Sequence, residues 1–307
     1  MASTSFSPST FALPDGRRLR YTLTFPDEPE RRTVVLSSLL ATTAAVWDDV
    51  VEVLHQNGFR ALTYDHPGHG GSSAPADLQR NTFQGMADDV FALLQSLSLS
   101  KVYAWIGCSL GAATGVVFAA RHPGVLDRMV VCDTISGSPG NLGAPDAFTP
   151  RIKALRDGQA TMEEGLAQTR ERWLGKEFLD RHPEKAAWLA QLMSETTLDG
   201  FEACIAALLS PGFDLREIEP GIGVDKLLVV VGEKDADLPT TMEALADQIR
   251  DGDKRVVDFR VIKNAGHASF IDGFDSWCEV VVKFLLEFKA QRGHLLSHIK
   301  HRGAGRP

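Results

Sequence analysis

Short, nearly uninterrupted apolar runs alternate along this chain with longer segments of helical periodicity. A strand without a polar face has to be covered on both sides, as in a parallel sheet between two layers of helices. Strands that alternate with helices are joined by right-handed crossovers. The sequence therefore predicts an α/β fold with a doubly wound, mostly parallel sheet. The predicted strands are 18–25 (an edge strand, from its alternating polarity), 32–38, 59–65, 102–107, 127–134, 225–232 and 257–263, and the helices are 46–56, 82–97, 110–121, 240–250 and 274–288.

One stretch interrupts this alternation. From about residue 140 to residue 215 the sequence contains helical patterns and no good strand. A helical insertion after the strand that ends at Thr134 would lie above the carboxyl ends of the strands, where open α/β sheets bind ligands. We therefore predict a core formed by 1–139 and 216–290, a helical cap over 140–215, and a basic, flexible tail over 291–307.

Composition and charge restrict the partners of the chain. The 307 residues carry a net charge of −8 with no basic block in the body of the chain, which argues against nucleic acid and anionic membranes. No apolar segment is long enough for a membrane span or a secretory signal. The four cysteines are far apart and form no metal-binding spacing, as in a reducing compartment. We expect a cytoplasmic protein with a small-molecule partner. The sequence is compatible with a homodimer.

Gly107-Cys108-Ser109-Leu110-Gly111 fits the G-x-S-x-G pattern directly after a predicted strand and directly before a predicted helix. In this context the pattern is typical of a nucleophile elbow, whose middle residue is exposed at the top of the sheet. The middle residue is Ser109, although a thiolate at Cys108 would be the stronger nucleophile. We expect Ser109 to react and Cys108 to pack.

A serine nucleophile needs a base, and the base needs a group that orients it. Asp235 and His267 follow two later strands, at the same edge of the sheet as Ser109, in the order Ser, Asp, His. Asp133, at the end of its own strand, is the alternative orienting group. The developing oxyanion needs two backbone donors, for which we select the amides of Leu110 and Leu40.

The segments Leu36–Ala41, Cys132-Asp133-Thr134, Arg172-Trp173 and 200–216, together with the elbow and the loops of Asp235 and His267, resemble the α/β-hydrolase superfamily, and most closely its 3-oxoadipate enol-lactonases. The resemblance covers about residues 18–288. It implies a serine hydrolase that needs no cofactor or metal and that cleaves a small lactone or ester. Ser38-Leu39-Leu40-Ala41 departs from the Asn-Ser-Leu-Gly of those lactonases. The same frame also allows a carboxylesterase, a carbon–carbon bond hydrolase or a weakly catalytic ligand receptor.

We assign Trp173, Arg172 and Ser38 to substrate binding. An enol-lactone of this type carries a carboxylate, for which the nearby cations are Arg170, Arg172 and Lys176. Helical spacing allows only one of the two arginines to point inward. His66 and His69 could suggest a metal pair, but their glycine-rich surroundings favour a structural turn. The tail histidines His294, His298 and His301 are likewise not taken as a metal site.

Overall fold

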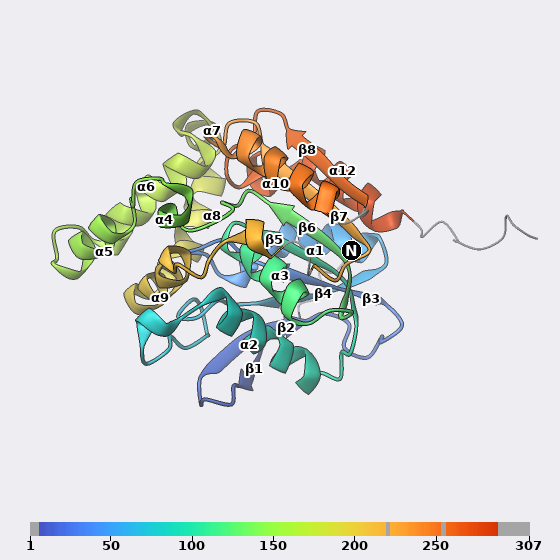
Figure 1. The fold of residues 1–307 in the computed structure, drawn as a ribbon. Helices are drawn as coiled ribbons and strands as arrows, with labels where there is room; N and C mark the ends of the chain where they lie inside the picture. The colour runs from blue at the N-terminus through green and yellow to red at the C-terminus, as the bar shows by residue number, and fades with distance from the viewer. Residues whose placement is uncertain (1–5, 219–221, 253–255, 288–307) are drawn as a thin grey trace, which may run out of the picture.

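The computed structural model describes residues 6–218, 222–252 and 256–287. Its strands form one eight-stranded sheet in the order β1-β2-β4-β3-β5-β6-β7-β8 (Figure 1). From β3 to β8 all neighbours are parallel, and β2 pairs antiparallel with β4. The strands are β1 Ser9–Ala12, β2 Arg18–Leu23, β3 Arg32–Ser37, β4 Phe59–Tyr64, β5 Val102–Cys108, β6 Leu126–Cys132, β7 Lys226–Gly232 and β8 Val256–Ile262. The predicted doubly wound sheet is confirmed.

The prediction that 18–25 forms an edge strand was wrong. β1, which the sequence analysis did not identify, pairs antiparallel with β2 and occupies the edge instead. The two strands form a hairpin whose turn includes Gly16 at φ 88° and a hydrogen bond from the Leu13 amide to the Arg17 carbonyl at 2.8 Å. β1 has only four residues, three of them exposed, so it lacks the apolar run on which strand prediction depends.

Helices cover both faces of the sheet. On one face α1 contacts β4 and α12, and on the other α2 and α3 pack together while α3 contacts β5 and β6 (Figure 1). α10 packs on β7 and β8. It begins two residues before its predicted start, and it can do so because proline, here Pro239, is tolerated in the first turn of a helix. These elements are η1 Ala44–Trp47, α1 Asp48–Gln56, η2 Leu78–Arg80, α2 Phe83–Ser96, α3 Leu110–Arg121, α10 Leu238–Gly252, α11 Ser269–Asp272 and α12 Phe274–Leu286.

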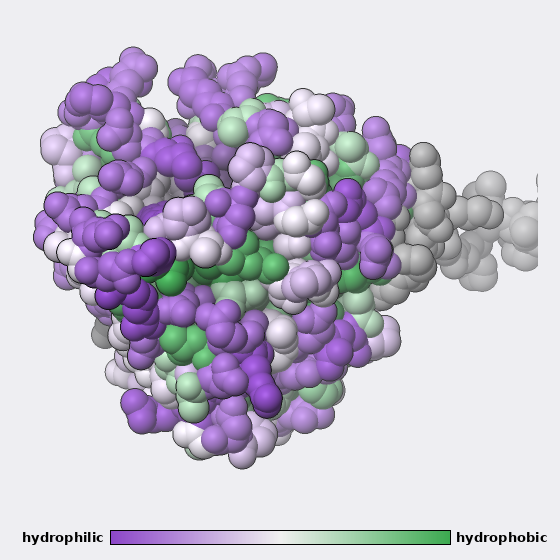
Figure 2. Space-filling model, turned by 60° about the vertical axis from the view of Figure 1, so that its left-hand side comes forward, coloured by the Kyte–Doolittle hydropathy of each residue, from purple (hydrophilic) through white to green (hydrophobic). Residues whose placement is uncertain are grey.

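The chain between β6 and β7 is helical as far as the structure describes it. These helices gather at the left of the sheet in Figure 1 and cap the loops that follow the strands. Their surface includes the side turned forward in Figure 2, which is mostly hydrophilic with hydrophobic areas between. They are α4 Pro139–Leu142, α5 Thr149–Arg156, α6 Met162–Leu174, α7 Lys176–Arg181, α8 Pro183–Ser194, α9 Leu198–Leu209 and η3 Leu215–Glu217. The predicted tail, 291–307, lies outside the described residues.

No helix in the described part of the chain is both long and apolar enough to cross a membrane. The core is continuous through the sheet, with Trp47, Trp105 and Trp277 among its largest buried side chains.

Helix α3 approaches the sheet closely because its first turn has no side chain on that side. A Cβ atom added to Gly111 would lie 2.1 Å from the Ser37 carbonyl oxygen of β3, and one added to Gly107 would lie 2.4 Å from the Gly111 oxygen. Backbone atoms on both sides cannot yield, so the position of α3 depends on these glycines.

We therefore expect Gly111→Ala to lower the free energy of unfolding by about 3 kcal/mol, since the added methyl group overpacks a rigid contact. Gly140→Ala is the matched control, because its Cβ would meet no atom within 4 Å. Urea denaturation of both variants measures the difference. Equal stabilities would show that the sheet does not constrain α3 at this point.

Candidate active site

Ser109 occupies the sharp turn between β5 and α3. Its φ of 54° and ψ of −115° are unfavourable for a residue with a side chain, and its carbonyl accepts hydrogen bonds from Ala112 and Ala113 at the start of the helix. Its own amide donates to the Cys132 carbonyl of β6 at 2.8 Å. The side chain is half-buried at the positive end of the helix dipole. This is the geometry of a nucleophile elbow.

His267 and Asp235 complete a hydrogen-bonded chain with Ser109. The Ser109 hydroxyl lies 3.0 Å from His267 Nε2, and His267 Nδ1 lies 2.7 Å from Asp235 Oδ2. With the Nδ1 proton donated to the carboxylate, Nε2 is left as the acceptor for the hydroxyl. His267 and Asp235 are both buried, 6% and 5% exposed. The structure thus brings together the three side chains that the sequence suggested.

Asp133, the alternative orienting group, has no hydrogen bond to His267. Its Oδ1 accepts from the Gly232 amide at 2.8 Å and its Oδ2 accepts from the Ser269 hydroxyl at 2.6 Å. Burial and the nearby Asp235 carboxylate raise the pKa of Asp133 well above its usual value. Asp133 therefore ties the end of β7 to the segment after His267.

Cys108, which precedes Ser109, has its side chain in the interior of the protein. Its thiol is fully buried, 3.6 Å from the His267 carbonyl and 3.9 Å from Asp133 Oδ2. Burial and the Asp133 carboxylate raise the pKa of the Cys108 thiol. A protonated, inaccessible thiol is a poor nucleophile, so this geometry favours Ser109.

The two selected amides are differently placed. Leu110 is the first residue of α3, where helix amides have no acceptor within the helix. Leu40 follows β3 in a turn, and in the described part of the chain no acceptor is found for its amide. Its neighbour Ala41 has a φ of 61°, the left-handed region that glycine adopts most easily. Ala41 thus has a backbone conformation that favours glycine, the residue at this place in the lactonase pattern.

The three residues assigned to substrate binding separate into two groups. Ser38 is fully buried and Trp173 is 2% exposed, so neither presents a surface to a ligand in this conformation, and their assignment has no support here. The Trp173 carbonyl instead accepts the His267 amide at 2.8 Å, and its ring lies 5.8 Å from the His267 ring. Arg172 is exposed.

Arg172 and Arg151 form a cationic pair that the sequence analysis recognised only in part. Burial lowers the pKa of Arg172, against the effect of the Asp235 carboxylate. Burial, and after it the charge of Arg172, lowers the pKa of Arg151. Among the described residues neither guanidinium has a carboxylate within ion-pair distance. By contrast, the two other cations of this helix region have acidic neighbours. The Glu163 carboxylate opposes the effect of burial on the pKa of Arg170, and Lys176 forms an ion pair with Asp180 at 2.7 Å. Arg151 lies 21 positions before Arg172, on another helix, so no local spacing connects them.

Asp272 was also missed. Its Oδ2 accepts the Gly266 amide at 2.7 Å, and burial raises its pKa to about 6. Within the described ranges no group of three or more His, Cys, Asp or Glu side chains could hold a metal ion.

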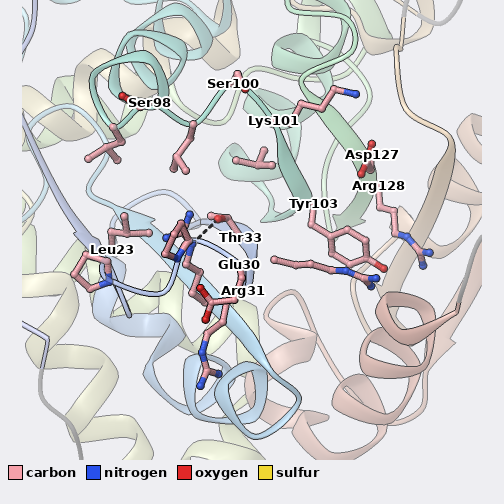
Figure 3. Close-up of a pocket in the computed structure, with 17 residues that line it drawn as sticks. Leu23, Glu30, Arg31, Thr33, Ser98, Ser100, Lys101, Tyr103, Asp127 and Arg128 are labelled. Atoms are coloured by element: carbon pink, nitrogen blue, oxygen red, sulfur yellow. Dashed lines mark hydrogen bonds between the residues drawn. The ribbon is translucent and has the colours of Figure 1, made fainter.

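A pocket of about 820 Å³ lies at the other end of the sheet, where β3, β4, β5 and β6 begin (Figure 3). Its Arg128 is engaged with the backbone carbonyls of Phe284 and Glu287, and its Arg60 with the Thr33 hydroxyl at 2.8 Å. Because the strands are parallel, this pocket is a full strand length from Ser109, and it is not part of the candidate active site.

Comparison with known proteins places this geometry in a family. The family model described as "alpha/beta hydrolase fold" matches residues 34–274. The chain is 26% identical over 208 residues to 3-oxoadipate enol-lactonase 2 of Acinetobacter baylyi, which covers 68% of this chain and 73% of that protein. It is 25% identical over 276 residues (87% and 91%) to a protein of Yersinia enterocolitica named provisionally as the carbamate hydrolase RutD.

A solved structure is similar along nearly the whole chain. The enol-lactonase from Burkholderia xenovorans LB400 has a TM-score of 0.77 and 29% sequence identity, and the match covers 91% of this chain and all of that one. With the family model, these relatives and the observed sheet in agreement, the chain is a hydrolase that belongs to the α/β-hydrolase fold family.

Proposed function

We propose that this hydrolase cleaves a small lactone or ester through a Ser109-His267-Asp235 triad and an acyl-enzyme. The observation that carries the proposal is the continuous contact from the Ser109 hydroxyl through both nitrogens of His267 to Asp235. Each contact has the length of a hydrogen bond, and the serine is at a strained elbow beside a helix N-terminus. The four cysteines are all unpaired, which agrees with the predicted reducing compartment.

In the first half-reaction Ser109 Oγ attacks the substrate carbonyl and His267 Nε2 takes the hydroxyl proton. Asp235 keeps the Nδ1 proton on the imidazole and stabilises the imidazolium. The amides of Leu110 and Leu40 donate to the oxyanion, worth about 3 kcal/mol each in comparable sites. The carbon–oxygen bond to the leaving group then breaks, and His267 returns the proton to that oxygen.

In the second half-reaction His267 takes a proton from water, whose oxygen attacks the acyl carbon. The bond between the acyl carbon and Ser109 Oγ then breaks, His267 returns the proton to Oγ, and the acid leaves. For a lactone the leaving hydroxyl stays tethered to the acyl group. Water must therefore outcompete re-closure of the ring.

The cationic pair Arg151 and Arg172 supports a substrate that bears a carboxylate. Burial and the charge of Arg172 lower the pKa of Arg151, and an anion bound beside the two guanidinium groups would offset that repulsion. Arg172 is the exposed member and is close enough to Asp235 to feel its charge. The similarity to enol-lactonases supports the same class of substrate. Carbamates are the second candidate, from the Yersinia relative, and carboxylesters and carbon–carbon bonds remain within the reach of the same triad.

Ser109→Ala should lower kcat by at least about three orders of magnitude, because no other nucleophile is available at the elbow. Cys108→Ala should stay within about tenfold of wild type, since its thiol packs and stays protonated. Steady-state acid release measures both, with folding checked by circular dichroism. Loss of activity in folded Cys108→Ala would transfer the nucleophile to the thiol.

Asp235→Asn should lower kcat by about four orders of magnitude, because the asparagine amide imposes the wrong tautomer on His267. The expected change in KM is small. Asp133→Asn is the matched control: it disturbs the hydrogen bonds to Gly232 and Ser269, so it should reduce stability more than kcat. The reverse ranking of the two kcat values would make Asp133 the orienting acid.

Arg172→Gln should lower kcat/KM for lactones that carry a carboxylate by about 10- to 100-fold, the range of one hydrogen bond to a charged group. Neutral lactones should change by less than about threefold. Arg170→Gln, on the same helix but facing Glu163, is the control. Wild-type rates that are equal on charged lactones, neutral lactones, straight-chain esters and carbamates would contradict the lactonase assignment and leave a general hydrolase.

A further inference from the structure

Two buried histidines lie beside the loop that carries the Leu40 amide. His66 and His69 are both fully buried and have no part in the chemistry proposed above. They belong to the loop after β4, from which the Asp65 carboxylate also accepts the Ala44 amide at 2.8 Å. Buried imidazoles need a structural or functional reason, because burial costs their ring nitrogens the hydrogen bonds of water.

The two rings hold the Leu40 loop at both ends. His66 Nε2 donates to the Ser38 carbonyl at 2.8 Å, on the side of β3. His69 Nε2 accepts the Ala41 amide at 2.9 Å, on the other side. The peptide that presents the Leu40 amide lies between these two contacts. Its orientation therefore depends on both.

The hydrogen bonds of His69 define its tautomer. Nδ1 donates to the Pro67 carbonyl at 2.9 Å, which leaves the lone pair on Nε2 free to accept from Ala41. Burial lowers the pKa of His69 to about 4, so the ring is neutral around pH 7. A protonated ring would have no acceptor for the Ala41 amide.

Ala41 needs this contact because of its backbone conformation. At a φ of 61° an alanine is less stable than in the right-handed region. Without a fixed acceptor for the Ala41 amide, the Ala41 backbone would move to a more favourable conformation, and the Leu40 amide would rotate with it. The hydrogen bond to His69 opposes that relaxation.

His69 is itself held from the side of the cap. It forms an antiparallel bridge with Thr196, and the neighbouring Gly70 amide donates to the Glu195 carbonyl at 3.0 Å. A Cβ atom on Gly68 would lie 2.2 Å from the Gly200 Cα, so the two backbones are in direct contact. His69 therefore cannot move away from Ala41 without disturbing the start of α9.

We propose that His69 is a positioning residue for the oxyanion hole, which fixes the Ala41 amide and thereby aims the Leu40 amide at the carbonyl oxygen of the substrate. This inference rests on the proposed function, because it assigns a task to one of the two amides that receive the oxyanion there. His69 touches neither substrate nor Ser109, and it acts only through the loop.

The test compares His69→Phe, which keeps a ring but has no acceptor, with His69→Gln, whose amide oxygen can accept near the Nε2 position. His69→Phe should lower kcat about 10- to 100-fold with KM changed less than about threefold, because a misdirected oxyanion donor weakens the transition state more than substrate binding. The affinity for a boronic acid that forms a tetrahedral adduct should fall in parallel with kcat/KM. His69→Gln should recover most of both.

His122→Phe is the matched control, since His122 bonds Asp88 at the far end of α3 and should keep wild-type kcat. Equal losses in the Phe and Gln variants, or an unchanged kcat in His69→Phe while Ser109→Ala is inactive, would overturn the role of His69 alone. An active Ser109→Ala would instead overturn the proposed function. In the wild-type enzyme the Ala41 amide should exchange slowly with deuterium, and rapid exchange in the folded protein would also overturn the proposal.

Discussion

Helix α3 can begin directly after Ser109 only because no side chain separates its first turn from strand β3. The missing atoms at Gly107 and Gly111 bring the helix N-terminus, the strand end and the loop after β3 to one point. The Ser109 hydroxyl, the Leu110 amide and the Leu40 loop are neighbours for that reason. Parallel strands then deliver Asp235 and His267 to the same edge from two later crossovers.

Polar groups at this edge are shared among several tasks. Asp133 joins β7 to Ser269, Asp272 holds the Gly266 amide, and Asp235 alone faces the imidazole. Burial and the nearby Asp235 carboxylate raise the pKa values of Asp133 and Asp272, although both accept hydrogen bonds. The amides of Gly232 and Gly266 and the Ser269 hydroxyl occupy these two carboxyl groups, so Asp235 is the one of the three that contacts His267.

Much of the fold and the three-residue chain at the site follow from local patterns in the sequence. Apolar runs identified seven strands within two residues at each end, and the elbow pattern singled out Ser109 in the presence of Cys108. β1, Arg151 and the contact between His69 and Ala41 could not be predicted in this way. β1 is too short and exposed to show an apolar run. The other two depend on partners brought close by the fold: Arg151 on Arg172, and His69 on a loop 28 positions earlier. The glycine-rich surroundings of His69 correctly indicated a turn and gave no sign of what the ring holds.

The hydrogen bond from the His267 amide to the Trp173 carbonyl limits how the cap can be exchanged between relatives. A cap grafted between β6 and β7 would bring its own backbone to the place where the His267 amide is held, and Gly266 leaves no room for a different approach. The module that recombination or protein engineering can transfer is thus the cap together with the loop after β8. The position of His267 and the backbone of the cap therefore change together.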